Sequence, residues 1–501
     1  MSHTDVLIVG AGISGISMAC HLQTECPDRT YAILEGRSDI GGTWDLFRYP
    51  GVRSDSDMHT LGFRFKPWKH EKSIADGPSI MDYLRETVAE HRIEDKIRFG
   101  YRVERADWDS VTSRWTLTAR RTDTGESVQF TANFLAMCTG YYSYKGGYLP
   151  EFKGREQFGG TIVHPQEWPD NLDYTGKNVV VIGSGATAMT IVPAMARTAA
   201  HVTMLQRTPT YVVARPDRDA VNDALRKVLP DRAAYAITRR KNVILGSYFY
   251  KRTRTQPEKV KNLILGGVRK ALGPDFDVKT HFTPEYNPWD QRMCLLPNGD
   301  LFRSIKSGKA SVVTDTIESF DETGIRLSSG GHVDADIIVT ATGLNLVTVG
   351  EMDFTVDGEP VDFSKRWTYR GMGYSDVPNL ITTFGYINAS WTLRADLISR
   401  YVCRLLNHMK SADAVQATPR LRASDRGMQQ RAFIEDFSPG YMQRVMHLMP
   451  MQGDREPWVN SQDFNREKKL IGRGPVTDGV MQFLSSADVQ RLVPSGGNQG
   501  A

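Results

Sequence analysis

The sequence has no apolar run of about 18 residues, the length that a membrane-spanning helix needs. Near its start, residues 3–9 (HTDVLIV) lack the basic stretch and long apolar core of a secretory signal peptide. The five cysteines are scattered, with no CxxC pair and no His-Cys metal spacing. We therefore expect a cytoplasmic chain with reduced, mostly buried thiols and no metal site.

A large charge of one sign is absent as well. Lys and Arg number 62, Asp and Glu number 58, and the formal net charge is +4. A nucleic-acid-binding protein concentrates basic residues on one face, and so mild a balance does not indicate one. Small molecules are therefore the expected partners, with no nucleic acid among them, while the oligomeric state stays open.

What the chain does have, first, is a Gly-rich loop. Residues 5–22 (DVLIVGAGISGISMACHL) combine an apolar strand, a G-x-G-x-x-G turn and a helical pattern, which is the context of a dinucleotide fingerprint. The next strand, YAILE, ends at Glu35, whose carboxylate can accept hydrogen bonds from the ribose hydroxyls of an adenosine. This half predicts an FAD site. The loop residues expected to bind FAD are Gly10, Gly12, Ser14 and Gly15.

A second Gly-rich loop follows at residues 177–196 (KNVVVIGSGATAMTIVPAMA). The strand after it ends in Gln206-Arg207 instead of an acid, and a cation there favours the 2′-phosphate of NADPH. The alternative is that Arg207 only faces solvent. The residues expected to bind NADPH are Gly183, Ser184, Gly185, Ala186, Thr187 and Arg207.

Two buried strands that end in Thr-Gly, within 134–140 and 335–343, are typical of the return from each nucleotide-binding half. The patterns together predict an α/β fold with two Rossmann-like dinucleotide-binding domains, for FAD and NADPH, and a helical insertion in the NADPH domain. The expected parts are 1–145 and 346–501 for the FAD domain with the C-terminal region, 146–215 and 290–345 for the linker and NADPH domain, and 216–289 for the insertion.

Three further stretches are more specific than the loops. Residues 158–170 (FGGTIVHPQEWPD) place Phe, Gly, His and Trp-Pro at fixed offsets, and residues 41–55 (GGTWDLFRYPGVRSD) form a second signature. A late motif spans 336–343, from an Asp to Ala-Thr-Gly. Over most of its length the chain thereby resembles the single-chain Baeyer-Villiger monooxygenases that use FAD and NADPH. It departs from their pattern at Leu344, where an aromatic residue is usual.

The resemblance implies an enzyme that uses NADPH and O2 to insert one oxygen atom into a ketone, giving an ester or lactone through a C4a-peroxyflavin. Residues 51–68 and 286–302 look similar to the mycobacterial branch that activates the thioamide ethionamide, which adds sulfides and thioamides to the expected substrates. The alternative is an N-hydroxylating or heteroatom-only flavin monooxygenase. A dithiol reductase would need a cysteine pair, and a non-catalytic FAD and NADPH sensor is the remaining non-enzyme interpretation.

By the same resemblance, one arginine stabilises negative charge on oxygen, and Arg292 in WDQRMC stands in its place. Asp55 is the expected counter-charge, and the alternative is that Asp55 caps a helix N-terminus. Gly42, Thr43 and Trp44 would bring backbone and an aromatic wall against the flavin.

The segment 158–170 joins the two domains, and in the family its His is thought to couple their relative motion. His164 is therefore a hinge candidate, although a His that only hydrogen-bonds in a domain interface is the alternative. Phe158 and Trp168 are the expected packing anchors, with Gly160 between them.

Two helical patterns complete the prediction. Apolar residues at 397, 398, 401, 402 and 405 mark one face of a helix after Asn388, which is the expected flavin contact at that helix's start unless the helix is an ordinary core element. In the insertion, one apolar face is expected to hold Val260, Leu263, Ile264, Val268 and Leu272. The cluster Arg239-Arg240-Lys241 beside it leaves peripheral membrane contact open against a solvated charged face. Only the Gly-rich tail from about 494 is expected to be disordered.

Overall fold

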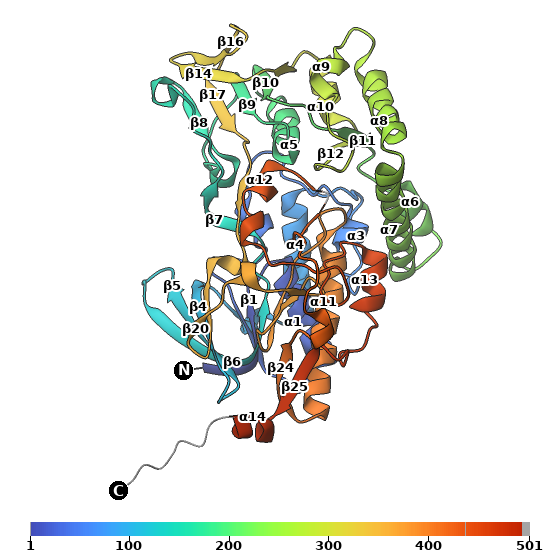
Figure 1. Cartoon of the computed structure of the whole chain (residues 1–501). Coiled ribbons are helices and arrows are strands. Elements are labelled where there is room, and N and C mark those ends of the chain that lie inside the picture. The colour runs from blue at the N-terminus through green and yellow to red at the C-terminus, as the bar shows by residue number, and fades with distance from the viewer. Residues whose placement is uncertain (1, 436, 493–501) are drawn as a thin grey trace.

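Two β-sheets organise the computed structural model, which describes residues 2–435 and 437–492 (Figure 1). In each sheet a parallel strand leads through a Gly-rich loop into a helix, so the expected α/β fold with two Rossmann-like units is confirmed. The tail that was expected to be disordered lies outside the described residues.

The first sheet has nine strands in the order β20-β19-β4-β5-β6-β1-β2-β3, with β23 paired to β6. Near its centre is β1, which runs parallel to both β2 and β6 and whose second half, residues 6–9, is buried. The strands are β1 (Ser2–Val9), β2 (Tyr31–Leu34), β3 (Ile97–Arg98), β4 (Tyr101–Asp109), β5 (Arg114–Arg121), β6 (Ser127–Met137), β19 (Asp353–Val356), β20 (Glu359–Pro360) and β23 (Leu380–Thr382).

The second sheet is parallel throughout, in the order β13-β10-β9-β17-β8. Its strands are β8 (Thr161–Val163), β9 (Asn178–Ile182), β10 (His201–Gln206), β13 (Ala310–Thr314) and β17 (Ile337–Thr340). Each unit has a buried apolar core.

Helices follow the loops and cover the sheets. α1 (Ile13–Glu25) follows β1, α5 (Ala186–Met195) follows β9, and α11 (Trp391–Ser411) packs against α1. The apolar face expected for α11 is confirmed, since all five of its residues are buried: Leu397, Ile398, Tyr401, Val402 and Leu405. Shorter elements near the site are α2 (Thr43–Leu46), α3 (Met58–Leu61), β12 (Cys294–Pro297), α10 (Asp300–Lys306) and α12 (Gly440–Gln443).

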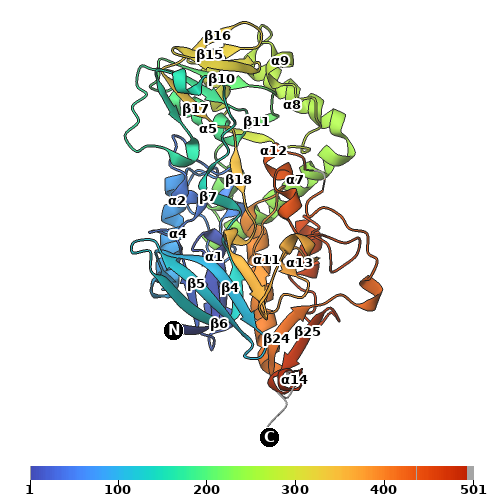
Figure 2. The ribbon, with the colours of Figure 1, turned by 60° about the vertical axis from the view of Figure 1, so that its left-hand side comes forward.

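Two short antiparallel strands, β7 (Tyr142–Gly147) and β18 (Leu344–Leu346), lie between the units (Figure 2). In the two-stranded sheet that they form, Leu344, where the late motif departs from the family pattern, pairs with Gly147. The chain therefore crosses from one unit to the other through a small sheet.

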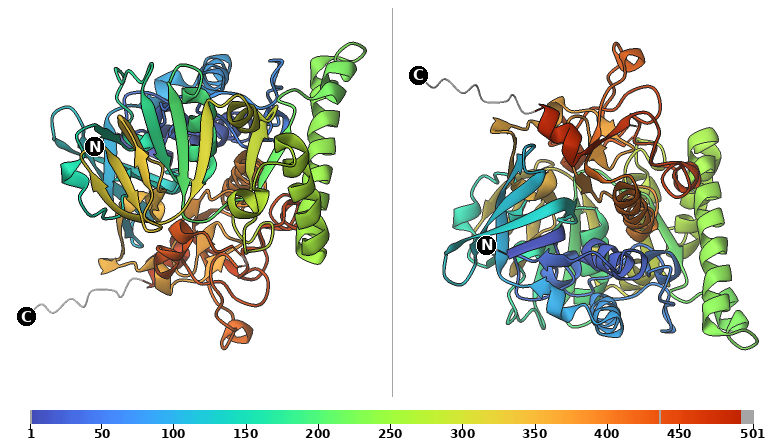
Figure 3. Two further views of the ribbon diagram at one scale, coloured as in Figure 1. Left: turned by 90° about the horizontal axis from the view of Figure 1, so that it is seen from above. Right: turned by 90° about the horizontal axis from the view of Figure 1, so that it is seen from below.

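Helices of the insertion line one edge of the molecule (Figure 3). They are α6 (Ala220–Leu225), α7 (Asp231–Thr255), α8 (Pro257–Leu272) and α9 (Val278–Phe282). Four of the five apolar residues expected on one face of α8 are buried, but the expectation for Leu263 is wrong, because it is 71% exposed. Leu265, 3% exposed, is buried instead, since it precedes Val268 and Leu272 by three and seven residues. Among the described helices, none is both long and apolar enough to cross a membrane.

Candidate active site

One cleft of about 1250 Å³ takes its walls from both nucleotide-binding units. Both Gly-rich loops reach it, as do the signature at 41–55 and Arg292. Of the residues expected to bind a cofactor, those that line the cleft are Gly10, Gly12, Ser14, Glu35, Gly42, Thr43, Trp44, Asp55, Gly183, Ser184, Gly185, Ala186, Thr187 and Arg207. Gly15 and Asn388 are not among its lining residues.

In the first loop, glycine is required where backbone approaches backbone. Gly10 has φ of 103°, and a Cβ there would lie 2.6 Å from the carbonyl oxygen of Cys138. A Cβ on Gly15 would lie 1.9 Å from the carbonyl oxygen of Gly10. Gly15 therefore lets α1 start against the turn, and the loop stays narrow enough for a pyrophosphate to reach the helix N-terminus.

Glu35 is held beside that loop at the end of β2. Its carboxylate accepts hydrogen bonds from the backbone N–H of Ala11 at 2.7 Å and of Arg37 at 2.9 Å. The residue is 3% exposed, and burial raises the pKa of its carboxyl group despite those two donors. Because the carboxylate still borders the cleft, it fits the ribose of an adenosine.

The signature at 41–55 lies directly on the first loop. The N–H of Gly41 donates to the carbonyl oxygen of Ala11 at 3.0 Å, and a Cβ on Gly42 would lie 3.2 Å from the Cα of Gly12. Thr43 and Trp44 follow at the start of α2 and border the cleft. The two sequence signatures thus form one surface.

The second loop has the same geometry. Gly183 has φ of 134°, and a Cβ there would lie 2.4 Å from the carbonyl oxygen of Ala341. Arg207 is exposed at the end of β10 and borders the cleft, and within the described part of the chain no carboxylate pairs with it. The loop and this cation fit a dinucleotide that carries an additional phosphate.

Asp55 and Arg292 meet across the cleft, with 3.6 Å between carboxylate Oδ2 and guanidinium Nε. Their side chains are 17% and 40% exposed. Burial lowers the pKa of Arg292, but the charge of Asp55 and then the neighbouring tyrosines outweigh it, and the net shift is upward. The helix cap that was the alternative for Asp55 falls to Asp57, which accepts a hydrogen bond from the N–H of Thr60.

Aromatic residues near Arg292 form a wall of the cleft, and sequence reasoning missed them. Tyr141 and Tyr142 share a hydroxyl contact of 3.2 Å, and the ring of Tyr141 stacks on Trp391 with centroids 5.1 Å apart. The indole N–H of Trp391 donates to the Ser14 hydroxyl at 2.7 Å, which ties α11 to the first loop. Tyr441 also contributes to this wall. In the sequence, the only signal of the wall is the pair of tyrosines that directly follows the Thr-Gly at 139–140.

His164 lies beside the two-stranded sheet of β7 and β18 and is not among the residues that line the cleft. Its Nδ1 accepts from the N–H of Gln166 at 3.2 Å, so Nε2 carries the proton and donates to the carbonyl oxygen of Gly343 at 3.2 Å. A Cβ on Gly147, the last residue of β7, would lie 1.8 Å from the imidazole, so the ring packs directly against this glycine. His164 therefore contacts both β7 and the residue just before β18. Burial lowers the pKa of His164, which favours the neutral ring.

The other fingerprint residues pack around this contact. Phe158 is 8% exposed, and its ring contacts that of Phe320. Trp168 packs against the apolar core of the second unit. A Cβ on Gly160 would lie 2.3 Å from the carbonyl oxygen of Asp336. Asn388 donates its amide to the carbonyl oxygen of Gln462 at 3.0 Å.

Two dinucleotide-binding loops that border one cleft, together with Arg292, define a protein built to hold two nucleotide cofactors. Residues 67–266 match the family described as Flavin-binding monooxygenase-like, and residues 8–77 match an NAD(P)-binding Rossmann-like domain. The chain is 51% identical over 482 residues to the FAD-containing monooxygenase EthA of Mycobacterium tuberculosis (strain ATCC 25618 / H37Rv), an alignment that covers 96% of this chain and 98% of that protein.

Solved structures share the fold. An oxidized steroid monooxygenase bound to NADP superimposes with a TM-score of 0.77 at 23% identity, over 97% of this chain and 100% of the other. An OTEMO complex with FAD and NADP does so with a TM-score of 0.72 at 19% identity, over 96% and 99%. The chain belongs to the FAD-containing monooxygenases. The cofactors expected from its two loops, FAD and NADPH, are confirmed with that family.

Proposed function

We propose that this monooxygenase is of the Baeyer-Villiger type and inserts one oxygen atom into ketones, with sulfides and thioamides such as ethionamide as further substrates. The observation that carries the proposal is the pair Arg292 and Asp55, which lies in the cleft that both Gly-rich loops border. A fixed cation beside the reacting carbonyl stabilises the negative charge that develops on oxygen.

Each part of the cleft has a task in this proposal. FAD, once reduced by NADPH, supplies the activation of O2. Glu35 would hold the adenosine ribose of FAD, and Arg207 the 2′-phosphate of NADPH. Arg292 stays protonated because its pKa is raised, and Asp55 keeps the guanidinium aimed into the cleft. Tyr141, Tyr142 and Trp391 would add apolar surface to the cleft near Arg292, and a less polar surrounding strengthens the action of a charge.

The test is product analysis under labelled oxygen. The purified yellow protein would be incubated with NADPH, ¹⁸O2 and phenylacetone, and separately with an aryl sulfide. An ester that carries one labelled oxygen supports the proposal. A labelled sulfoxide without any ester supports the alternative, a heteroatom-only or N-hydroxylating monooxygenase. NADPH oxidation that yields only hydrogen peroxide with every substrate would exclude both.

The remaining parts of the proposal concern the domains. The divisions near residues 145, 215, 289 and 345 and the flavin contact of Asn388 are part of the same proposal. His164 would act as the hinge: its single hydrogen bond to Gly343 can break and re-form when one unit rotates on the other, which supports this role.

A further proposal is peripheral contact with an anionic membrane through α7 and α8. Residues 231–272 hold eleven basic and two acidic residues, a net charge of +9, whereas the whole chain carries +4, so the remainder carries −5. The exposed apolar residues of the two helices, 47–71% exposed, are Ile237, Ile244, Leu245, Tyr248 and Leu263. Apolar side chains among cations suit a surface of anionic lipid headgroups.

A further inference from the structure

Helix α7 lies outside the cleft, yet it contacts both loops that present the Asp55 and Arg292 pair. Asp57 follows Asp55 by two residues and Asp290 precedes Arg292 by two residues. α7 binds both of these acids, one near its middle through Asn242 and one at its end through Arg254.

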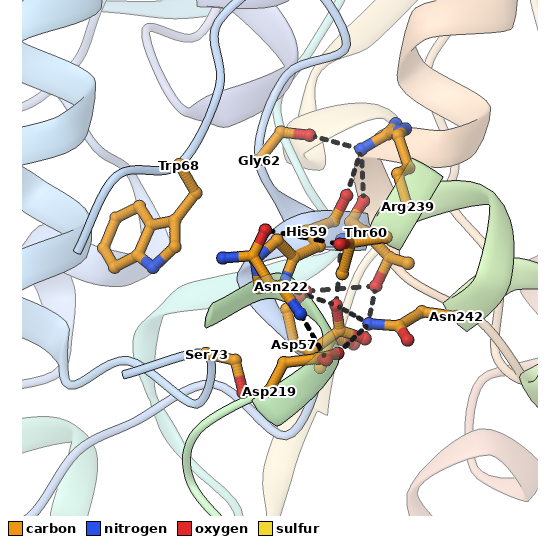
Figure 4. Close-up of polar contacts among 12 residues, drawn as sticks. Asp57, His59, Thr60, Gly62, Trp68, Ser73, Asp219, Asn222, Arg239 and Asn242 are labelled. Carbon is orange, nitrogen blue, oxygen red and sulfur yellow. Dashed lines mark hydrogen bonds and ion pairs between the residues drawn. The ribbon is translucent and has the colours of Figure 1, made fainter. Parts of the chain in front are cut away.

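The first anchor, Asp57 with Asn242, lies where α7 packs against α3, and Asp57 is buried (Figure 4). The amide Nδ2 of Asn242 donates to Oδ1 of Asp57 at 2.9 Å. Burial by itself raises the pKa of Asp57, but His59, Asn242 and Thr60 hold the net pKa below its ordinary value. The carboxylate is therefore charged, and its bonds to α7 and to the N-terminus of α3 are charge-assisted.

Arg239 strengthens the same anchor from one turn earlier in α7. Its Nη1 lies 2.8–3.1 Å from three carbonyl oxygens at the end of α3, those of His59, Thr60 and Gly62 (Figure 4). Asp219 fixes Asn242 in turn, since it accepts from that amide at 3.2 Å and from Lys241 at 2.7 Å. The side chain that reaches Asp57 thus has little freedom of its own.

The second anchor holds the turn before Arg292. Nη1 of Arg254 donates to Oδ1 of Asp290 at 2.7 Å, and the ring of Tyr250 meets Trp289 edge-on with centroids 5.8 Å apart. Trp289 has φ of 72°, a left-handed conformation that a bulky residue keeps only where neighbouring contacts impose it. The contacts from α7 are therefore part of what shapes this turn.

A continuous helix connects the two anchors. Asn242 and Arg254 are twelve residues apart within α7, which at 1.5 Å per residue keeps them about 18 Å apart. Asp55 and Arg292 come from segments far apart in the chain, and their 3.6 Å separation depends on how both loops are held.

We propose that α7 is a positioning element for the catalytic pair, with Asn242 and Arg254 as positioning residues. The proposal rests on the function proposed above, because it assigns the pair its role. If either anchor is lost, Arg292 shifts relative to the substrate while the nucleotide loops stay intact. Misplacement on the order of 1 Å can cost about 100-fold in rate.

The test compares Asn242→Ala, Arg254→Ala and Arg254→Lys with a matched control, Arg232→Ala, which removes an exposed arginine from the first turn of the same helix. Hydrogen-deuterium exchange of the cofactor-free protein would be followed in peptides covering 52–58 and 286–294. We expect faster exchange in the first peptide for Asn242→Ala and in the second for Arg254→Ala. Arg254→Lys should restore part of the protection.

The second readout is the fate of NADPH electrons in the FAD-loaded enzyme. We expect unchanged flavin reduction by NADPH, product formation lowered about 10- to 100-fold, and hydrogen peroxide raised in proportion, with the control at the wild-type level. Unchanged exchange in both peptides would overturn the proposal, and so would loosened loops with wild-type product yield. If wild-type enzyme forms no oxygenated product, the proposed function fails, whereas the exchange data still decide whether α7 holds the loops. Should Asn242→Ala not fold, the two Arg254 variants decide alone.

Discussion

Arg53 and Asp300 form an ion pair between the two nucleotide-binding units, with Nη1 of the guanidinium 2.5 Å from Oδ2 of the carboxylate. The two side chains are only 12% and 15% exposed. Arg53 lies two residues before Asp55, and Asp300 is the first residue of α10. The pair therefore connects the signature at 41–55 to the second unit through a mostly buried contact.

Replacing Asp300 by Ala is expected to destabilise the protein. The change leaves the guanidinium of Arg53 buried without its carboxylate, and breaking a buried pair in this way typically costs about 3–5 kcal/mol. The measurement is the midpoint of thermal unfolding. In the double variant Arg53→Met/Asp300→Leu no unpaired charge remains, so part of the loss should return. Losses that simply add in the double variant would contradict this account.

The sequence predicted the structure best at positions where only glycine fits the backbone conformation and the space. Gly10 and Gly183 sit at positive φ against a neighbouring carbonyl group, and such positions recur at fixed offsets between a strand and a helix. Arg53 with Asp300 and Arg254 with Asp290 have no such signal, because each pair depends on how separate segments pack. The prediction that Leu263 is buried was wrong, because residue spacing shows which face of a helix is apolar but not how much of that face the neighbouring elements cover.

Arg207→Ala is expected to change the preferred nicotinamide cofactor. The guanidinium is exposed at the cleft, and a charge-assisted hydrogen bond to a phosphate contributes about 1.5–3 kcal/mol. KM for NADPH should therefore rise roughly 10- to 100-fold, while KM for NADH stays nearly constant. Steady-state flavin reduction with each cofactor measures this. A parallel rise for both cofactors would show that Arg207 acts on the loop and not on the 2′-phosphate.

Arg292→Ala separates reduction of the flavin from oxygen insertion. The variant keeps both Gly-rich loops, so NADPH should still bleach the flavin at close to the wild-type rate. Ester formation from phenylacetone should fall by about 100- to 1,000-fold, the usual cost of losing a preorganised charge stabiliser. Arg292→Lys should recover part of the rate, since it restores the charge without the planar guanidinium. Ester formation at the wild-type rate in Arg292→Ala would remove this residue from the mechanism.

His164 should make stability depend on pH. Its folded pKa lies below the ordinary value of about 6.5, so the unfolded chain takes up a proton first as the pH falls. The stability from its neutral ring is full above about pH 6.5 and is lost as the pH falls toward the folded pKa. Between pH 7.5 and 5.5, wild type should lose more thermal stability than His164→Gln, which cannot titrate. Parallel curves for the two proteins would mean that protonation of His164 does not oppose folding.

Binding to vesicles tests the exposed surface of α7 and α8. Each basic residue near an anionic bilayer contributes about 1 kcal/mol, so Lys251→Glu/Lys270→Glu should weaken sedimentation with phosphatidylglycerol vesicles by at least about 10-fold. Both lysines are exposed, and the control Arg114→Glu/Lys153→Glu reverses two exposed charges elsewhere. Ile244→Ser/Tyr248→Ser should weaken binding even at low salt, because the apolar contribution is not screened. If the control loses as much binding as the helix variant, attraction is spread over the whole surface, and α7 and α8 form no membrane site.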